Sequence, residues 1–461
     1  MKKNIICDIN PFNGEIIQEI EISDIETVHK KVEIARSASL KWRKLDVCER
    51  VNRLQYVYQS IQRREDELAI LISKEVGKPI REARNEVANT LNEVKWYLDH
   101  GVEYLSEEIL NEDTNKIDIL VRDPWGVAAV ICPFNVPLEI SMWGIMPNLI
   151  SGNTVVFKPS EYTPLVGQKI YEIFSEICLD DGVINIVNGA GDTGKTLVES
   201  DIDFVWFTGS SKVGQEVYAT CGKKFINSVM ELGGSNATII FDDVEVNDKL
   251  VSEICFGRFF NCGQVCSAIK RLFVHEKIYD KFMALFVKKV ASLKVGDPMD
   301  DSVDIGTLIS ESQRKLLIEQ VQDAIQKGAK LECGGKCLDS YKNGVFYMPT
   351  ILSNITEGMR VSFEEIFGPV LPVIKFKEEE KAIQMINNTE YGLSSEIYTS
   401  DIERAKKLAL KIDAGRVSVN MPRFASLDCP MGGYKKSGKG REHGKWIFEE
   451  LTQLKHIMIK R

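Results

Sequence analysis

A thiol and a carboxylate, each placed beside glycines, are the side chains of this sequence best suited to covalent chemistry. Cys266 ends the run Asn-Cys-Gly-Gln-Val-Cys, and Glu231 begins the run Glu-Leu-Gly-Gly earlier in the chain. A cysteine sulfur can hold a carbonyl carbon covalently, and a carboxylate can activate the water that later releases it. The two runs together predict an acyl-transferring site with Cys266 as nucleophile and Glu231 as general base.

Each candidate residue also has a structural interpretation when it is taken alone. Cysteine is among the most buried residue types, so an arbitrary cysteine usually belongs to a core. An isolated Glu231 would be interpreted as a solvated acid, and Asn135, which lies between Pro133 and Pro137, as a turn residue. The polar Asn-x-Gly-Gln frame before Cys266 favours the catalytic interpretation.

The composition is that of an ordinary folded protein. The chain has 461 residues, of which 44% are hydrophobic and 27% charged, and its net charge is -9. This length predicts two or three domains, and the negative charge argues against a nucleic-acid partner. No run approaches the roughly 18 apolar residues that span a bilayer, so no membrane association is expected. The short basic cluster, Lys435, Lys436, Lys439 and Arg441, is interpreted as a solvated loop.

The cysteines point to a reducing compartment. There are 11 of them, scattered without the spacing of a disulfide framework, which predicts reduced thiols and a cytoplasmic location. Cys262 lies four residues before Cys266, a spacing that zinc pairs also use. Because none of the five histidines is near this pair, no metal site is predicted.

One motif predicts an unrelated chemistry. Residues 189–196 satisfy the phosphate-loop pattern G-x-x-x-x-G-K-[ST], with Lys195 as the lysine, and follow a predicted strand. The run that ends at Asp242 resembles a magnesium-binding strand end. The helix after the loop would be short, however, since acidic residues and the next strand follow at once. An ATPase remains a remote alternative.

The pattern of apolar residues predicts an α/β protein. Steps of three and four residues predict helices over most of the first hundred residues. Short apolar runs then alternate with helical stretches, which is typical of a parallel sheet with helices on both faces. The expected strands are 117–121, 127–131, 154–157, 183–187 and 204–207, a second series at 237–241, 370–376 and 417–419, and a terminal strand at 454–459.

Six motifs, in order along the chain, resemble those of the aldehyde dehydrogenase superfamily, in the type that does not transfer its acyl group to coenzyme A. The resemblance covers nearly the whole chain and is weakest before about residue 40. The motifs are 133–137, 158–164, 207–214, the Glu231 and Cys266 segments taken together, 364–369 and 432–438.

The resemblance implies NAD-dependent oxidation of an aldehyde to its carboxylic acid. It implies that Cys266 attacks the aldehyde, that Asn135 donates to the resulting oxyanion, and that Glu231 activates the hydrolytic water. Glu161 would accept both adenosine-ribose hydroxyls and repel a 2′-phosphate, which favours NAD and leaves NADP as the alternative. The residues implied for cofactor binding are Pro133, Phe134, Lys158, Ser160, Glu161, Thr208, Gly209, Ser210, Gly214, Leu232, Gly233, Glu365 and Phe367.

The resemblance also implies a domain organisation. Residues 1–106 and 125–233 are expected to form a doubly wound, Rossmann-like NAD-binding domain, and 234–430 an α/β catalytic domain. Residues 107–124 and 431–461 would form a small β extension for oligomerisation. Because such extensions pair between subunits in this superfamily, a homodimer or homotetramer is expected.

The sequence departs from the superfamily pattern near the expected substrate. Gly144 stands where many members carry a lysine, which puts a proton relay through that lysine in question. Val136 and Met431 replace aromatic residues and suggest a roomier mouth, and Arg423 could meet a carboxylate-bearing semialdehyde. An NADP-using succinate-semialdehyde or lactaldehyde dehydrogenase is therefore an alternative. A coenzyme A-acylating enzyme and a catalytically silent binding protein are further alternatives, and the full Glu231 segment argues against the first of these.

Overall fold

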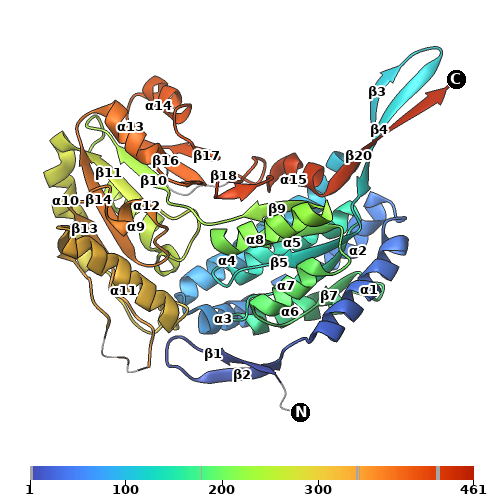
Figure 1. Cartoon of the computed structure of the whole chain (residues 1–461), viewed down its shortest axis with the longest axis horizontal. Helices are drawn as coiled ribbons and strands as arrows, with labels where there is room; N and C mark the ends of the chain where they lie inside the picture. The colour runs from blue at the N-terminus through green and yellow to red at the C-terminus, as the bar shows by residue number, and fades with distance from the viewer. Residues whose placement is uncertain (1–3, 178, 339–340, 342, 422–425) are drawn as a thin grey trace.

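The chain folds into two sheets, each covered by helices, with a thin β extension at one side (Figure 1). The computed structural model describes residues 4–177, 179–338, 341, 343–421 and 426–461. An N-terminal hairpin of β1 (Ile5–Ile9) and β2 (Ile16–Glu21) precedes the first helix. The predicted α/β class and the doubly wound arrangement are confirmed.

The first sheet has six strands in the order β19-β9-β8-β5-β6-β7. Its central strands are parallel, and β5, β6 and β8 are buried along their whole length, which explains their uninterrupted apolar sequences. The strands are β5 (Val127–Ile131), β6 (Thr154–Lys158), β7 (Ile184–Ile186), β8 (Phe204–Thr208), β9 (Asn227–Glu231) and the short antiparallel β19 (Gly438–Lys439).

Helices cover both faces of this sheet, because alternate residues of each strand point to opposite sides. Ala128 and Val130 of β5 join one apolar cluster, and Val127, Ala129 and Ile131 join the other. The helices on the first side are α2 (Val47–Gln62), α3 (Glu65–Val76), α4 (Ile80–Leu105), α5 (Pro137–Ser151), α6 (Pro164–Ser175) and α15 (Gly444–Glu450); α1 (Ile25–Trp42), α7 (Gly191–Glu199) and α8 (Ser211–Lys224) contribute to the second.

The second sheet has seven strands in the order β12-β13-β14-β11-β10-β16-β17, parallel except for β12. The strands are β10 (Ala237–Ile240), β11 (Arg271–His275), β12 (Lys330–Cys333), β13 (Thr350–Ser353), β14 (Val370–Phe376), β16 (Ser394–Tyr398) and β17 (Arg416–Val419). The helices around it are α9 (Asp248–Phe259), α10 (Glu276–Ala291), α11 (Glu311–Gln326), α12 (Arg360–Phe363), α13 (Glu379–Asn387) and α14 (Ile402–Ala409).

The chain passes from one sheet to the other directly after Glu231. Strand β9 ends at Glu231 and β10 begins at Ala237, so residues 232–236 form the crossing (Figure 1). A two-stranded ladder of β15 (Tyr391–Gly392) and β18 (Tyr434–Lys435) lies along the return path to β19. The first and last predicted domains therefore share a sheet, because β19 belongs to the predicted C-terminal segment.

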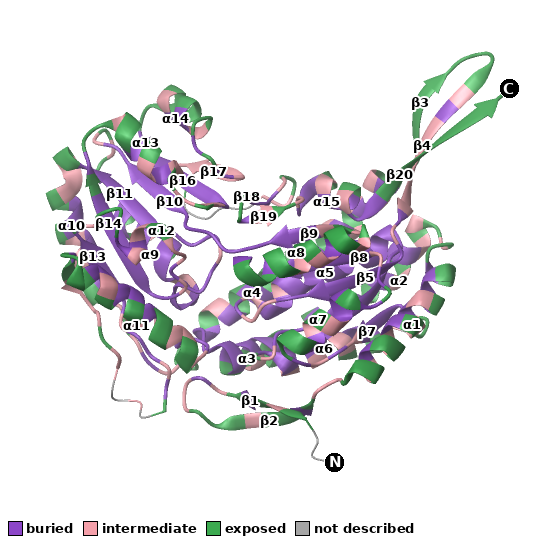
Figure 2. Cartoon of the chain, in the orientation of Figure 1, coloured by how far each residue is buried: buried purple, intermediate pink, exposed green. Residues whose placement is uncertain are grey.

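The β extension consists of β3 (Glu108–Glu112), β4 (Lys116–Pro124) and β20 (Thr452–Lys460). The terminal strand pairs with β4 over its full length, from Thr452 opposite Pro124 to Lys460 opposite Lys116. Figure 2 shows this extension as mainly exposed, in contrast to the buried strands of both sheets. Within this chain the terminal strand β20 thus pairs with β4, and the faces of the β extension remain exposed.

Gly144 allows helix α5 to lie directly on the first sheet. A Cβ atom added at Gly144 would lie 2.7 Å from Cγ1 of Val130 and 2.9 Å from Cδ1 of Trp206. These distances are shorter than real side-chain contacts, and both neighbours are fully buried. The position that carries lysine in many superfamily members is therefore closed to any side chain by the packing of α5 here.

We expect Gly144→Ala to destabilise the protein by about 1–3 kcal/mol, since an overpacked core forces its neighbours out of place. Gly222→Ala on α8 is the matched control, because a Cβ there meets no atom within 4 Å. The control should be neutral or stabilising by up to about 1 kcal/mol, as alanine favours helix. Thermal unfolding of the two variants beside the unmodified chain measures the difference, and equal melting temperatures for both variants would contradict this account of the packing.

Candidate active site

Cys266 is presented by a sharp turn that follows helix α9. The 3-10 segment η1 (Phe260–Gly263) contains three successive residues with left-handed backbone, Asn261, Cys262 and Gly263, at φ 51°, 54° and 73°. Glycine and asparagine tolerate such angles best, so the left-handed backbone of Cys262 carries most of the energetic cost of this turn. A hydrogen bond of 3.2 Å from Ala268 N to Val265 O then closes a turn with Cys266 inside it.

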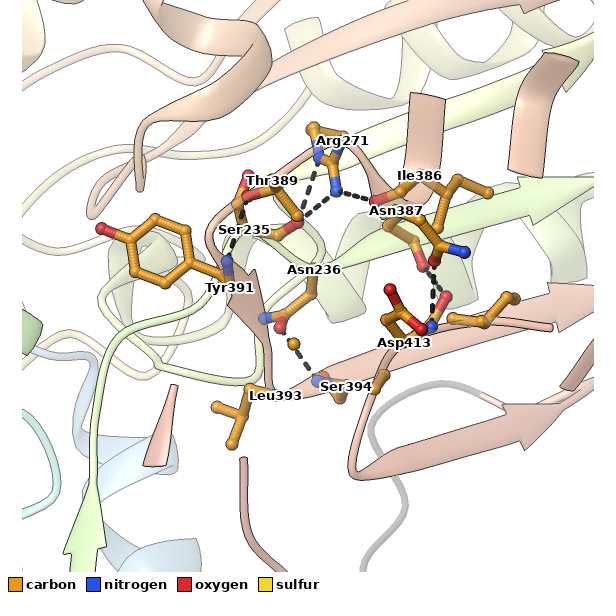
Figure 3. A pocket seen from close by; sticks show the side chains of 15 residues that line it. Ser235, Asn236, Arg271, Ile386, Asn387, Thr389, Tyr391, Leu393, Ser394 and Asp413 are labelled. Atoms are coloured by element: carbon orange, nitrogen blue, oxygen red, sulfur yellow. Dashed lines mark hydrogen bonds between the residues drawn. The ribbon is translucent and has the colours of Figure 1, made fainter. Parts of the chain in front are cut away.

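Asn236 in the crossing segment holds the other side of this turn. Its amide Nδ2 donates to the carbonyl oxygens of Cys266 at 2.6 Å and Ala268 at 2.8 Å, and its Oδ1 accepts from the N–H of Ser394. Figure 3 shows Asn236 beside Arg271, whose guanidinium donates to the Ser235 carbonyl. The segment that leads away from Glu231 therefore also fixes the backbone of Cys266.

Asn135 links the part of the chain around the first sheet to the part around the second sheet, beside the thiol. It lies between β5 and α5 and is 4% exposed. Its side-chain Nδ2 donates to the carbonyl of Gln264 at 2.9 Å, and its own carbonyl accepts from Lys78 Nζ at 2.8 Å and Asn261 Nδ2 at 2.6 Å. Because Nδ2 carries two hydrogens, the amide keeps a second donor for a ligand.

Glu231 lies at the carboxyl end of β9 and is 3% exposed. Within the described part of the chain its Oε1 has no hydrogen-bond partner. Burial raises the pKa of Glu231 to about 8, against the opposing effect of the Arg441 and Arg416 charges. A carboxyl group with a pKa near neutrality is suited to general-base chemistry.

The surroundings of Cys266 favour the protonated thiol. Burial raises the pKa of Cys266 to about 12, and the carboxylates of Glu231, Glu442 and Glu365 add to this effect. The Lys270 charge acts in the opposite direction. Because the thiolate is the nucleophilic form, a base or a bound ligand must assist its formation.

Two cavities meet at Cys266 and Asn135, which line both of them. One has a volume of about 350 Å³ and also reaches Glu231. The other has a volume of about 560 Å³ and is bounded by α4, α5 and the segment around Met431. The thiol thus stands between two chambers, one on the side of Glu231 and one on the side of helix α4.

The smaller cavity contains most of the side chains predicted to bind the cofactor. Its lining includes Pro133, Phe134, Thr208, Gly209, Ser210, Leu232, Gly233, Glu365 and Phe367.

The details of this lining suit a dinucleotide. Ser210 caps the start of α8, where free backbone N–H groups favour a phosphate. A Cβ at Gly233 would lie 2.2 Å from Oε2 of Glu365, so only glycine leaves that space open. The rings of Phe134 and Phe367 meet edge to face with centroids 6.0 Å apart.

The other four predicted cofactor residues lie outside this cavity. Lys158 is the last residue of β6, and Ser160 and Glu161 follow it; because β6 is parallel to β5, both strands end at the same edge of the sheet. Lys158 Nζ is 4.0 Å from a carboxylate oxygen of Glu161. Gly214 has a packing role, because a Cβ there would lie 2.3 Å from Leu232 Cδ2.

The sequence-based prediction missed a second buried carboxylate beside the base. Glu442 is fully buried, and among the described residues neither of its carboxylate oxygens has a hydrogen-bond partner. Burial and the neighbouring Glu231 hold the pKa of Glu442 well above its usual range, opposed by Arg416. Its neighbour His443 lines the larger cavity, and burial lowers the pKa of that imidazole to about 4. Glu442 directly follows the basic cluster, a pattern typical of a solvated loop, so no local pattern indicated its burial.

The positions that depart from the superfamily pattern fall in two places. Val136 and Met431 line the larger cavity. Arg423 lies outside the described residues. Gly144 lies in the interface between α5 and the sheet, so this position supplies no lysine ammonium for a proton relay to Glu231.

The phosphate-loop alternative is not supported by the geometry. Lys195 is exposed on the surface of α7. The proposed acidic partner, Asp242, follows β10 in the other sheet and pairs with Lys277 at 2.7 Å. Over the described ranges, no group of three or more His, Cys, Asp or Glu side chains is arranged to hold a metal. Nor is any helix of these ranges long and apolar enough to cross a bilayer.

Comparison with known proteins decides the family. A model of the aldehyde dehydrogenase family matches residues 2–457. The chain belongs to the aldehyde dehydrogenase family. It is 37% identical to a betaine aldehyde dehydrogenase of Bacillus subtilis, over 99% of this chain and 94% of the relative. It is 36% identical to human aldehyde dehydrogenase 1A1, over 98% and 91% of the two chains.

Solved structures of aldehyde dehydrogenases agree with this assignment. A betaine aldehyde dehydrogenase from Staphylococcus aureus, solved in complex with NAD+, superimposes with a TM-score of 0.95 at 32% identity and covers 99% of this chain and 91% of its own. An NADP-dependent enzyme of E. coli superimposes with the same TM-score of 0.95 at 31% identity, covering 99% and 95%. The predicted family, and with it an oxidoreductase that acts on aldehydes, is confirmed.

The raised pKa of Cys266 has a measurable consequence in this aldehyde dehydrogenase without ligands. At pH 8 a thiol whose pKa is about 12 is ionised to roughly one part in ten thousand. We therefore expect iodoacetamide to alkylate Cys266 slowly between pH 7 and 8, and the rate to rise about tenfold for each further pH unit. The exposed Cys48 serves as internal control when peptides are quantified by mass spectrometry. A rate at Cys266 that is fast and independent of pH would contradict the raised pKa of this thiol.

Proposed function

We propose that this chain oxidises an aldehyde to the carboxylic acid, with Cys266 as nucleophile, Asn135 as oxyanion donor and Glu231 as general base. The observation that carries the proposal is the position of the thiol between two cavities. The smaller one, bounded by Gly233 and Glu365, would hold the nicotinamide, and the larger one the aldehyde. A bound nicotinamide supplies the hydride acceptor for the carbon attached to sulfur.

The protein side chains account for the first half of the reaction. Once the ligands are bound, the Cys266 thiol releases its proton to solvent, and the sulfur attacks the aldehyde carbon so that the carbonyl oxygen becomes an oxyanion. The second N–H of the Asn135 amide donates to that oxygen, and the hydrogen bond to Gln264 keeps the amide in place. Departure of the hydride restores the C=O bond as a thioester on Cys266.

The second half is hydrolysis. Glu231 removes a proton from water, the water oxygen bonds to the thioester carbon, and the C–S bond breaks to return the thiolate. A pKa of about 8 keeps a useful fraction of Glu231 ionised at neutral pH. A water-activating carboxylate beside the thioester also argues against coenzyme A as the acceptor.

Cys266→Ala should abolish the aldehyde-dependent formation of reduced nicotinamide, because no covalent adduct can form. The measurement is the absorbance of the reduced cofactor with a panel of aldehydes and NAD. Cys48→Ala, at an exposed cysteine, is the matched control and should keep full activity. Turnover in the Cys266→Ala variant would refute the assignment of the nucleophile.

Glu231→Gln should separate the two halves of the reaction. One equivalent of reduced cofactor should form in a burst, followed by a steady state slowed by roughly a hundredfold or more, since the general base for hydrolysis is lost. Stopped-flow absorbance distinguishes the two phases. A steady-state rate equal to that of the unmodified enzyme would contradict the role of Glu231.

We further infer that the cofactor is NAD rather than NADP. Glu161 stands half-exposed where the adenosine ribose would lie, and its carboxylate would repel a 2′-phosphate. Lys158 offers an ammonium group to the same ribose but lies against the Glu161 carboxylate. Both side chains thus support recognition of unphosphorylated ribose hydroxyls.

Replacing Glu161 by glutamine should shift the cofactor preference toward NADP. We expect the ratio of kcat/KM for NAD over NADP to fall by about tenfold, because an exposed charge repulsion is screened and modest. The same ratio measured in Glu172→Gln, a change at an exposed carboxylate of α6, should not move. An unchanged ratio in Glu161→Gln would show that another residue selects the cofactor.

We also propose a homodimer or homotetramer in a cytoplasmic setting. The open faces of the β extension expose Ile109, Leu110, Leu454 and Met458, and such apolar groups favour association. The described cysteines are free thiols, which supports a reducing compartment.

A further inference from the structure

The larger cavity has an acidic wall made by helices α4 and α5. Asn85, Asn89 and Asn92 line it from α4, at spacings of four and three residues that place them on one face of the helix. Glu93 on the same face is 5% exposed, and Glu139 on α5 completes the wall. This wall therefore presents carboxylates together with side-chain amides, whose oxygens are acceptors.

Glu86, a third carboxylate of the cavity, is already neutralised by the protein. Lys78 Nζ lies 2.5 Å from its Oε2, with both side chains almost fully buried. The other carboxylate oxygen of Glu86 accepts from the backbone N–H of Leu138 at 2.9 Å. Lys78 is in turn committed to Glu86 and to the carbonyl of Asn135, so this pair brings no net charge to a ligand.

Glu93 differs from Glu86, because no described lysine, arginine or histidine forms an ion pair with it. Its carboxylate accepts from the indole Nε1 of Trp143 and contacts the carboxyl group of Glu139. Burial raises the pKa of Glu93 well above its usual range, and the charges of Glu139 and Glu442 raise it further. Two carboxyl groups held together in a cavity wall repel each other when both ionise, and a cation placed between them removes that repulsion.

Among the described lining residues, the cation that remains besides Lys78 lies on a different element. Arg416, at the start of β17, interacts chiefly with Cys266, Glu396 and Glu231, the groups at the reacting end. The charge of the described lining is thus divided between a basic residue near the thiol and a carboxylate pair on the α4–α5 wall.

We propose that the substrate is an aldehyde that carries a cationic nitrogen, and that Glu139 and Glu93 determine this specificity. This rests on the proposed function, since the same cavity contains Cys266. The nitrogen would lie against the α4–α5 wall while the aldehyde carbon reaches the thiol. An aldehyde with a terminal carboxylate would place a negative charge against this wall, which opposes its binding.

Two kinds of cationic nitrogen fit this description. A protonated amine would donate to the carboxylates and to the amide oxygens of the α4 asparagines. A quaternary ammonium has no N–H group, and would instead use the carboxylate charge and the rings of Trp143, Phe256 and Phe260. The two are distinguished by pairing each with a neutral aldehyde of the same shape.

The test compares kcat/KM within pairs of nearly identical shape. The pairs are 3-aminopropanal with butanal, 6-aminohexanal with heptanal, and trimethylammonioacetaldehyde with 3,3-dimethylbutanal; succinic semialdehyde is the anionic comparison. We expect at least one cation to exceed its neutral partner by about tenfold or more, as a charge-assisted contact typically gives. Succinic semialdehyde should be the poorest substrate.

Glu139→Gln and Glu93→Gln should each bring the cation-to-neutral ratio toward one, mainly through KM. The ratio is taken within each variant, so a general loss of activity cancels. If Glu139→Gln is unstable, Glu93→Gln still tests the inference, because glutamine at position 93 keeps an acceptor oxygen for the Trp143 indole. Glu103→Gln, at an exposed carboxylate of the same helix, is the matched control and should leave every ratio unchanged.

Ratios near one for all three pairs in the unmodified enzyme would overturn the inference, as would ratios that survive both substitutions. Turnover of the neutral aldehydes alone would leave the proposed function intact while this inference fails. If no aldehyde is oxidised at all, the proposed function fails, and calorimetric binding of 6-aminohexan-1-ol against heptan-1-ol then decides the inference. Equal affinity for these two alcohols would overturn it, and tighter binding of the amine that is lost in Glu139→Gln would support it.

Discussion

The site depends on the hydrogen bonds that converge on Asn135. Its side chain donates to Gln264 beside the thiol, and its carbonyl accepts from Lys78 on one half of the molecule and Asn261 on the other. All these groups are buried, so breaking one bond leaves an unpaired polar group whose desolvation costs about 1–3 kcal/mol. Asn135 therefore connects the α4–α5 layer to the turn that presents Cys266, and the two cavities meet at this residue.

Absent side chains allow the backbone segments around the thiol to lie close to one another. A Cβ at Gly263 would lie 2.4 Å from the carbonyl oxygen of Gly368, and one at Gly234 would lie 3.2 Å from the carbonyl oxygen of Cys266. The glycines around the base and the nucleophile thus permit backbone to approach backbone, which no other residue would allow. Burial is the main reason that the pKa values of Cys266 and Glu231 are both raised.

Much of the fold could be predicted because its strands are buried on both faces. Continuous apolar runs such as 127–131 and 204–207 predict central parallel strands, and both are found in the first sheet. The chemical motifs were equally local, since Glu231 and Cys266 each stand in a short glycine-containing segment. The domain division was harder to predict, because β19 in the C-terminal segment returns to pair with β9. A strand of two residues leaves no periodic pattern in the sequence.

Glu93 and Glu442 could not be predicted as parts of the site, for a physical reason. Glu93 stands among charged and polar residues of a long helix, a pattern typical of a solvated face, and only the packing of α4 against α5 buries it beside Glu139. Glu442 likewise follows a run of basic residues and becomes a neighbour of Glu231 only when β19 joins the first sheet. Burial of a charge is a property of tertiary structure, whereas the nucleophile and base are marked by the turns that present them. The sequence therefore indicates the reaction, and the electrostatic selection of a substrate becomes visible only when the helices are packed together.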